Sequence, residues 1–183
     1  MSVVVASLSE FDDFFAFFNL KPQFKIDRQE LESSYLTVQK AVHPDLYATG
    51  SESEKRISMQ LATFANGAYR TLKDPISRGL YICGKNGIDP QLETNTSMPA
   101  EFLMQQMEWR EALAQAGSSH EVEALEAEVK TAVTSMTAQL HRQLDETPDA
   151  RLGAAEAAQT VQRLMFLSKF QQDIDRKMDA LQI

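Results

Sequence analysis

Apolar residues recur at helical spacing through most of this chain, and a proline interrupts the pattern at one defined point. Between residues 31 and 42 they occupy positions i, i+4, i+7 and i+11, one face of a helix, as Leu31, Tyr35, Val38 and Val42. Pro44 follows two residues later. Because the residue before a proline disfavours the helical conformation, this helix is predicted to end at or before His43. A second periodic run after the polar loop 48–54 predicts a hairpin of two helices.

Other helix boundaries are marked by capping residues. Asp74 and Pro75 combine an N-cap with a proline in the first turn, and Ser118 with Glu121 forms a capping box. With only 7 glycines and 6 prolines in 183 residues, the composition also favours helix. The predicted fold is all-α, with an N-terminal helical hairpin and a C-terminal three-helix bundle. We expect an N-terminal domain over 1–83, a linker over 84–98 and the bundle over 99–183.

The charge of the chain limits the partners it can bind. The net charge is −8, divided as −1 over residues 1–90 and −7 over residues 91–183. Phosphate groups need a basic face, so nucleic acid is not expected as a partner. The same argument makes an anionic membrane surface an unfavourable partner.

Cysteine usage and hydropathy indicate the compartment. Cys83 is the only cysteine, so neither an intramolecular disulfide nor a cysteine cluster for zinc or an iron–sulfur centre can form. We therefore expect no metal site and no cofactor. The first residues lack a basic leader, and no apolar run reaches the roughly 20 residues that cross a bilayer. These features predict a cytoplasmic protein.

The segment 99–116 has more apolar residues than one buried helix face needs. At 100° per residue, Phe102, Trp109 and Leu113 lie on one side of the helix. A second stripe lies on roughly the other side, and it consists of Leu103, Met104 and Met107 flanked by Glu108 and Glu111. Either the helix is central in the bundle and buried on both sides, or the second stripe is exposed. Because the glutamates resist burial, exposure as a protein-docking surface is favoured. Phe166, which departs from the main stripe of the last helix, could join it or fill the core.

The tripeptide His43-Pro44-Asp45 admits three interpretations: an acid–base pair, part of a metal site, or a turn. Acid–base catalysis needs groups that converge in a cleft, whereas neighbouring loop residues on either side of a proline point outward. His120 and His141 are not at metal-ligand spacing from His43, and the common nucleophile and phosphate-binding motifs are missing from the sequence. We therefore expect no enzyme activity, although a small hydrolase that uses His43 is kept as an alternative.

The order helix, His-Pro-Asp turn, loop, helix resembles a J-domain. The resemblance extends over YLTVQKAVHPDLY (35–47) and FANGAYRTLKDPISRGLY (64–81). In the second half, FLMQQMEWREAL (102–113) and VQRLMFLSKF (161–170) are similar to the HscB-type co-chaperones of iron–sulfur cluster assembly. Together with FDDFFAFFNLKPQFKID (11–27), the resemblance covers nearly the whole chain.

This resemblance implies two partners. A J-domain over 1–83 docks on a DnaK/HscA-type chaperone and stimulates its ATPase, and Lys40, His43, Pro44 and Asp45 carry that contact. The bundle binds an IscU-type iron–sulfur scaffold protein through a surface that, by resemblance, consists of Leu103, Met104, Met107, Glu108, Glu111 and Phe166.

Two features depart from the J-domain pattern. The second helix has few basic residues, mainly Lys40 with Arg28 at its start, and Leu46 replaces the lysine that often follows the tripeptide. The electrostatic part of chaperone docking is therefore expected to be weak or specialised. The alternative function is a general J-domain co-chaperone whose bundle binds unfolded clients.

Overall fold

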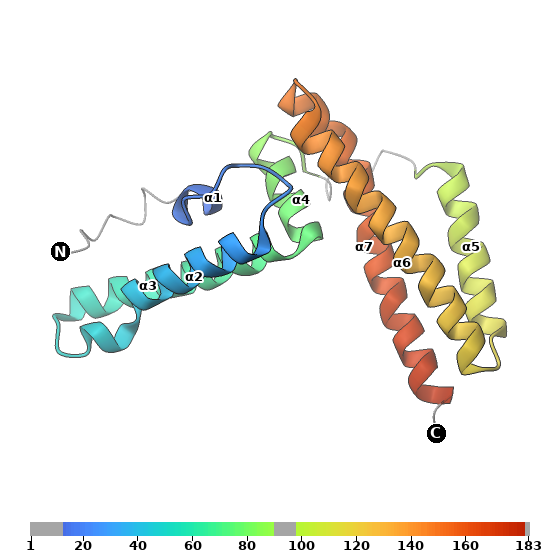
Figure 1. The fold of residues 1–183 in the computed structure, drawn as a ribbon, viewed down its shortest axis with the longest axis horizontal. Helices are drawn as coiled ribbons and strands as arrows, with labels where there is room; N and C mark the ends of the chain where they lie inside the picture. Colours follow the sequence, from blue (N-terminus) through green and yellow to red (C-terminus); the bar gives the residue numbers. More distant parts are fainter. Residues whose placement is uncertain (1–12, 90–97, 182–183) are drawn as a thin grey trace. The chain divides into compact units, whose positions relative to one another are not determined.

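The computed structural model describes residues 13–89 and 98–181, and every regular element within those ranges is helical. The chain divides into two compact units, Met1–Tyr81 and Ile82–Ile183, so the division falls inside helix α4 (Pro75–Lys85) (Figure 1). The predicted all-α class, a helical hairpin followed by a three-helix bundle, is confirmed. The expected linker over 84–98 lies largely outside the described residues, and its limits stay a prediction.

The first unit is a helical hairpin closed by a short aromatic helix. Helices α2 and α3 lie side by side and run in opposite directions (Figure 1). The rings of Phe14 and Phe17 both contact the ring of Phe64 on α3, with centroids 5.4 and 4.9 Å apart. The elements before α4 are α1 (Phe14–Phe17), α2 (Arg28–Val42), the 3-10 turn η2 (Pro44–Tyr47) and α3 (Glu52–Lys73).

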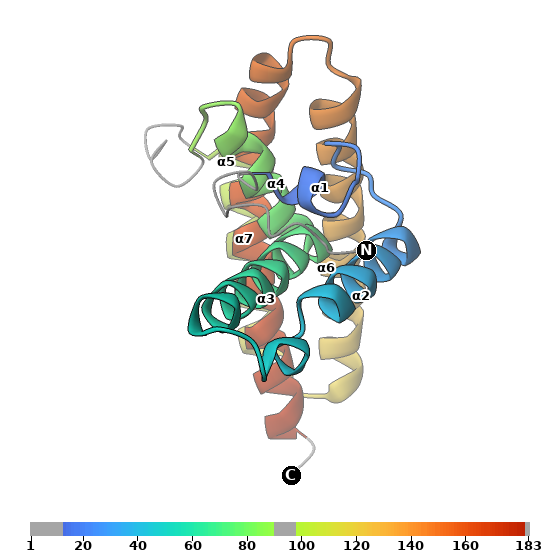
Figure 2. The same ribbon diagram turned by 90° about the vertical axis from the view of Figure 1, so that its left-hand side faces the viewer.

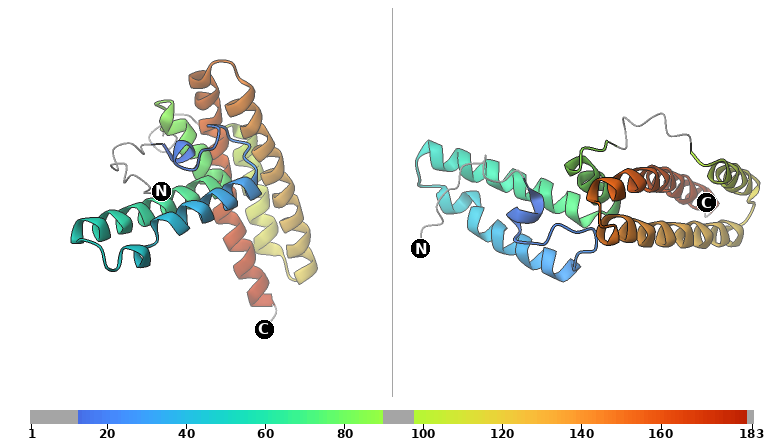
Figure 3. Two further views of the ribbon diagram at one scale, coloured as in Figure 1. Left: turned by 60° about the vertical axis from the view of Figure 1, so that its left-hand side comes forward. Right: turned by 90° about the horizontal axis from the view of Figure 1, so that it is seen from above.

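The second unit contains three long helices and a turn. Figure 2 shows α6 and α7 joined by a connection at the top of the view, and Figure 3 shows α5 alongside them. The apolar core is formed by side chains of all three helices, among them Phe102, Trp109, Val122, Val129, Leu167, Phe170 and Ile174. The buried indole N–H of Trp109 donates to Glu128 Oε1 at 2.8 Å. The elements are α5 (Ala100–Gln115), α6 (Ser119–His141), the π-helical turn η3 (Arg142–Glu146) and α7 (Ala150–Leu181).

Several helix boundaries follow the predicted capping signals. The loop expected over 48–54 is shorter than predicted, because Ser51 and Glu54 form a capping box and α3 begins at Glu52. Helix α2 ends at Val42, and α4 begins at Pro75 with the Asp74 carboxylate accepting from the Ser77 amide at 2.7 Å. Ser118 and Glu121 form the expected capping box at the start of α6. Hydrogen bonds from the Gly117 amide and from Ser118 lower the pKa of the Glu121 carboxyl from its usual value, because they stabilise its ionised form.

The described helices also bear on membrane insertion. None of the helices within residues 13–89 and 98–181 combines the length and the apolar content that crossing a bilayer requires.

Gly153 is buried near the start of α7, where the helix passes closely beside η3. A Cβ atom at this position would meet the Gln143 carbonyl oxygen at 2.2 Å, far inside contact distance. Gly153→Ala is therefore expected to lower the free energy of unfolding of the second unit by about 1–3 kcal/mol, because the two backbones must separate. Urea denaturation followed by the fluorescence of Trp109, the only tryptophan, measures the change.

Gly84→Ala is the matched control. Gly84 is exposed in α4, and a Cβ atom added there would have no neighbour within 4 Å. Alanine is a better helix former than glycine, so this change should leave stability unaltered or raise it by up to about 1 kcal/mol. Equal unfolding midpoints for the two variants would contradict the close approach at Gly153.

Candidate functional site

The His-Pro-Asp tripeptide forms the corner between α2 and α3. His43 has an extended backbone, with φ −60° and ψ 128°, and Pro44 opens the 3-10 turn η2. The proline thus ends α2 and immediately starts a tighter turn in a new direction. The structure confirms the predicted end of the helix.

Hydrogen bonds hold the backbone of this corner against both helices. The Ser58 hydroxyl, buried on α3, donates to the Val42 carbonyl at 2.7 Å. The Tyr47 hydroxyl donates to the Ala41 carbonyl at 3.3 Å. Both bonds satisfy carbonyl groups at the end of α2 that have no helical partner. The corner is therefore fixed by groups outside the tripeptide itself.

The side chains of the tripeptide's acid and base face solvent. His43 and Asp45 have side-chain exposures of 52% and 90%, and His43 Nδ1 lies 3.6 Å from Asp45 Oδ2. The ring nitrogen Nδ1 also accepts from the Asp45 amide at 3.3 Å. Lys40, in the last turn of α2, is exposed as well. This arrangement leaves the polar groups open to solvent and does not enclose them in a cleft, as acid–base catalysis would need.

Helix α5 has one buried and one exposed apolar face. Phe102 and Trp109 are 7% and 5% exposed and belong to the bundle core. On the other side Leu103, Met104 and Met107 are 45%, 62% and 71% exposed. The sequence left two interpretations open, burial of both sides of this helix or exposure of the second stripe. In the structure the second stripe is exposed. We call these three residues the α5 apolar face.

Carboxylates flank the α5 apolar face. Glu108 and Glu111 are both exposed, and each accepts a hydrogen bond from a glutamine on the same helix, Gln105 at 3.2 Å and Gln115 at 3.0 Å. Flexible thioether side chains surrounded by acids suit contact with a partner that carries an apolar segment and basic residues.

Phe166 occupies the seam between α7 and α5. Its ring is 5.9 Å from the ring of Phe102 and 6.1 Å from that of Phe170, and it is half-buried. The guanidinium of Arg110 lies over it, 5.1 Å from the centroid. Phe166 therefore packs against the core of the bundle, and Arg110 of α5 partly covers it.

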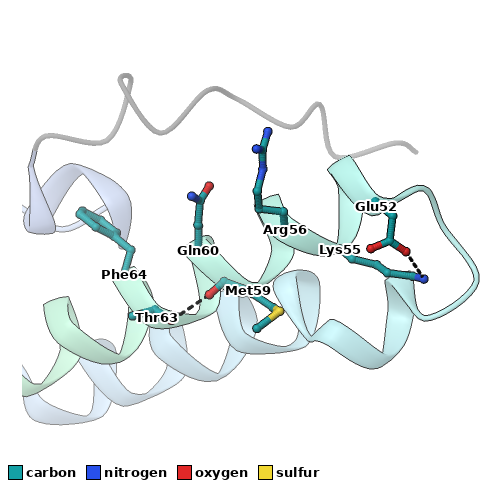
Figure 4. Close-up of a pocket in the computed structure, with 7 residues that line it drawn as sticks. All are labelled: Glu52, Lys55, Arg56, Met59, Gln60, Thr63 and Phe64. Carbon is teal, nitrogen blue, oxygen red and sulfur yellow. Dashed lines mark hydrogen bonds and ion pairs between the residues drawn. The ribbon is translucent and has the colours of Figure 1, made fainter.

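A hollow of about 720 Å³ lies along the first half of α3. Its described lining residues all come from α3, and Figure 4 shows Glu52 and Lys55 joined by an ion pair of 2.9 Å. Arg56, Met59 and Phe64 line the same hollow. Since no second described element contributes a group, we assign no site to it. Among the described residues, no cluster of histidine, cysteine or carboxylate side chains is suited to hold a metal ion.

Sequence reasoning missed two features of these surfaces. Leu46, in the turn after Pro44, is 64% exposed, and Leu36, on α2, is 44% exposed. The sequence shows that residue 46 departs from the J-domain pattern, but it does not show that the two leucines are exposed. The contact of Ser58 with Val42 was also missed, because no short-range pattern joins residues 16 positions apart.

A family profile described as the HSCB C-terminal oligomerisation domain matches residues 98–175. The chain is 42% identical over 173 residues to the co-chaperone protein HscB homolog of Aromatoleum aromaticum, covering 93% of this chain and 96% of the relative. It is 45% identical over 164 residues to the homolog of Bordetella avium, covering 89% and 95%.

Solved structures agree. The crystal structure of human co-chaperone protein HscB aligns with a TM-score of 0.83 at 29% identity, over 91% of this chain and 82% of that chain. Chaperone HscB from Vibrio cholerae aligns with a TM-score of 0.78 at 34% identity, over 92% and 99%. The similarity therefore extends across both units in sequence and in fold.

Proposed function

The chain belongs to the HscB co-chaperone family, and we propose that it stimulates the ATPase of a DnaK/HscA-type chaperone while delivering an IscU-type iron–sulfur scaffold protein to it. In this role the protein supports the assembly of iron–sulfur clusters and the maturation of the proteins that carry them. The predicted cytoplasmic location is part of this proposal. The protein itself performs no chemistry in it, because ATP is hydrolysed in the chaperone.

The α5 apolar face is the observation that carries the proposal. A helix that already buries Phe102 and Trp109 keeps Leu103, Met104 and Met107 in contact with water, which costs free energy unless a partner covers them. Glu108 and Glu111 beside them restrict that partner to one without an acidic rim. A single folded scaffold protein fits such a defined surface better than a range of unfolded clients does.

The corner supplies the second contact. His43 and Asp45 are exposed on a backbone that Ser58 and Tyr47 fix, so the chaperone meets a preformed surface. A preformed surface loses little conformational entropy on binding. Docking here shifts the chaperone's conformational equilibrium, and hydrolysis then accelerates at a nucleotide site remote from the contact.

Steady-state ATP hydrolysis by a purified HscA-type chaperone tests the whole proposal. We expect this protein alone to raise the rate, and this protein together with the purified scaffold to raise it by more than the product of their separate effects. The chaperone with scaffold alone is the control. Independent effects would contradict delivery of the scaffold, and synergy with unfolded model clients in place of the scaffold would favour a general co-chaperone.

A further inference from the structure

The first unit contains a second, electropositive pocket away from the His-Pro-Asp corner. It has a volume of about 570 Å³ and lies between the start of α2, the end of α3 and the start of α4. The 15 residues of α2 separate Arg28, at this pocket, from the corner, which is a distance of about 22 Å at the helical rise. The pocket is therefore a separate site on the hairpin.

Positive charge is concentrated at this pocket. Residues 13–81 contain nine lysine and arginine residues, and four of them line it. These are Arg28, Arg70, Lys73 and Arg78. Asp74 is the one carboxylate in the described lining, and its side chain caps α4 through the Ser77 amide. In a chain of net charge −8, this excess of cations marks a local site for an anion.

Three of these cations are not neutralised by any group that the structure describes. Within the described residues, Arg28, Arg70 and Lys73 have no carboxylate oxygen within the 4.0 Å that defines an ion pair. Arg70 instead donates to the Asn66 carbonyl at 3.2 Å, and the Lys73 ammonium lies 5.1 Å from the centre of the Tyr69 ring. Both contacts orient the side chains without cancelling their charge.

The fourth cation is built into the fold. Arg78 is 8% exposed, its guanidinium lies 4.7 Å from the centre of the Phe24 ring, and it donates to the Leu72 carbonyl. These contacts hold the guanidinium group in place at the wall of the pocket. Its position is fixed by packing.

The chemistry of the walls selects among anions. Ile26, Leu31 and Pro75 contribute apolar surface between the cations. The amide groups at the start of α2, which could cradle a phosphate, are already bound by the Asp27 carboxylate at 2.7 and 3.3 Å. Guanidinium groups match carboxylates through paired hydrogen bonds. We propose that this pocket binds an acidic peptide segment of a partner protein, with two or more carboxylates flanking an apolar side chain.

Fluorescence anisotropy of the full chain tests the proposal directly. The probe is a short fluorescein-labelled peptide of glutamates around a central pair of leucines, with both ends blocked. We expect saturable binding that weakens as salt is raised, and we expect Arg70→Gln with Lys73→Gln to weaken it about tenfold, because two unneutralised charges are lost. This readout needs neither the chaperone nor the scaffold, so its result is independent of the proposed function.

Lys55→Gln with Arg56→Gln is the matched control, since it removes two positive charges from the same helix at its other end. It should change affinity by less than about twofold. Equal weakening by the two double variants would show a general charge effect and overturn the proposal. Equal binding of a peptide with glutamines in place of the glutamates would also overturn the proposal. The same holds if inorganic pyrophosphate displaces the probe at a lower concentration than unlabelled peptide does.

Discussion

Asp45→Asn is expected to abolish stimulation of the partner chaperone's ATPase while leaving the fold and scaffold binding intact. The carboxylate is 90% exposed, and its oxygen Oδ2 lies 3.6 Å from His43 Nδ1, so its removal costs the free protein little stability. The backbone of the corner keeps its hydrogen bonds from Ser58 and Tyr47. What is lost is one negative charge at the contact, and a charge that becomes desolvated and paired in a complex contributes far more there than in water.

Steady-state ATPase measurements over a range of co-chaperone concentrations give the result, and thermal melting checks the fold. Glu52→Gln is the matched control, because this carboxylate belongs to the same unit and is 91% exposed. It should stimulate as the unchanged protein does. Full stimulation by Asp45→Asn would show that the corner is not part of the contact with the chaperone. A lowered melting temperature would show that Asp45 has a structural role instead.

Local signals predicted several of the helix ends, although α3 begins at Glu52, inside the segment 48–54 that was expected to be a loop. Pro44 restricts the backbone of His43, and the structure ends α2 one residue earlier, at Val42. Asp74 and Ser118 cap α4 and α6 through amide groups within three residues. Each of these signals acts through atoms that are neighbours in the sequence, so no knowledge of the tertiary fold was needed.

The features that were missed depend on residues distant in the sequence. The electropositive pocket exists because antiparallel helices bring Arg28 at the start of α2 close to Arg70 and Lys73 at the end of α3. The close approach of Gly153 to Gln143 arises where α7 passes η3. Periodicity assigns a residue to a helix face but does not say which residues of another helix lie opposite. The position of such a site is therefore determined by how the helices pack against one another.

The two-sided helix α5 lies between these cases. Its periodicity predicted two apolar stripes, and the acids beside one of them favoured exposure. The choice between a central and a peripheral helix depends on how much of α5 the other two helices cover. The structure covers the side of Phe102 and Trp109 and exposes that of Leu103, Met104 and Met107. Under the proposed function, this exposed stripe is the part of α5 that a partner covers.

Met104→Ser combined with Met107→Ser should weaken scaffold binding by at least about tenfold without unfolding the bundle. The two side chains are 62% and 71% exposed, so the free protein loses little buried apolar area when they are shortened. In a complex the same thioethers would be covered, and each loss would then reduce the apolar area removed from water. Isothermal titration with the purified scaffold measures the change in affinity.

Met59→Ser provides the control for loss of an exposed methionine. This side chain is 61% exposed on α3 in the other unit, so the change alters surface hydrophobicity to a similar degree per residue without touching α5. Scaffold affinity should then remain unchanged.

The fluorescence of Trp109 reports whether the bundle of the double variant stays folded, because this indole packs on the opposite side of the same helix. If urea unfolded the double variant at a much lower concentration, the methionines would be stabilising the bundle. If affinity and stability were both unchanged, the scaffold would bind elsewhere, and the α5 apolar face would need another partner.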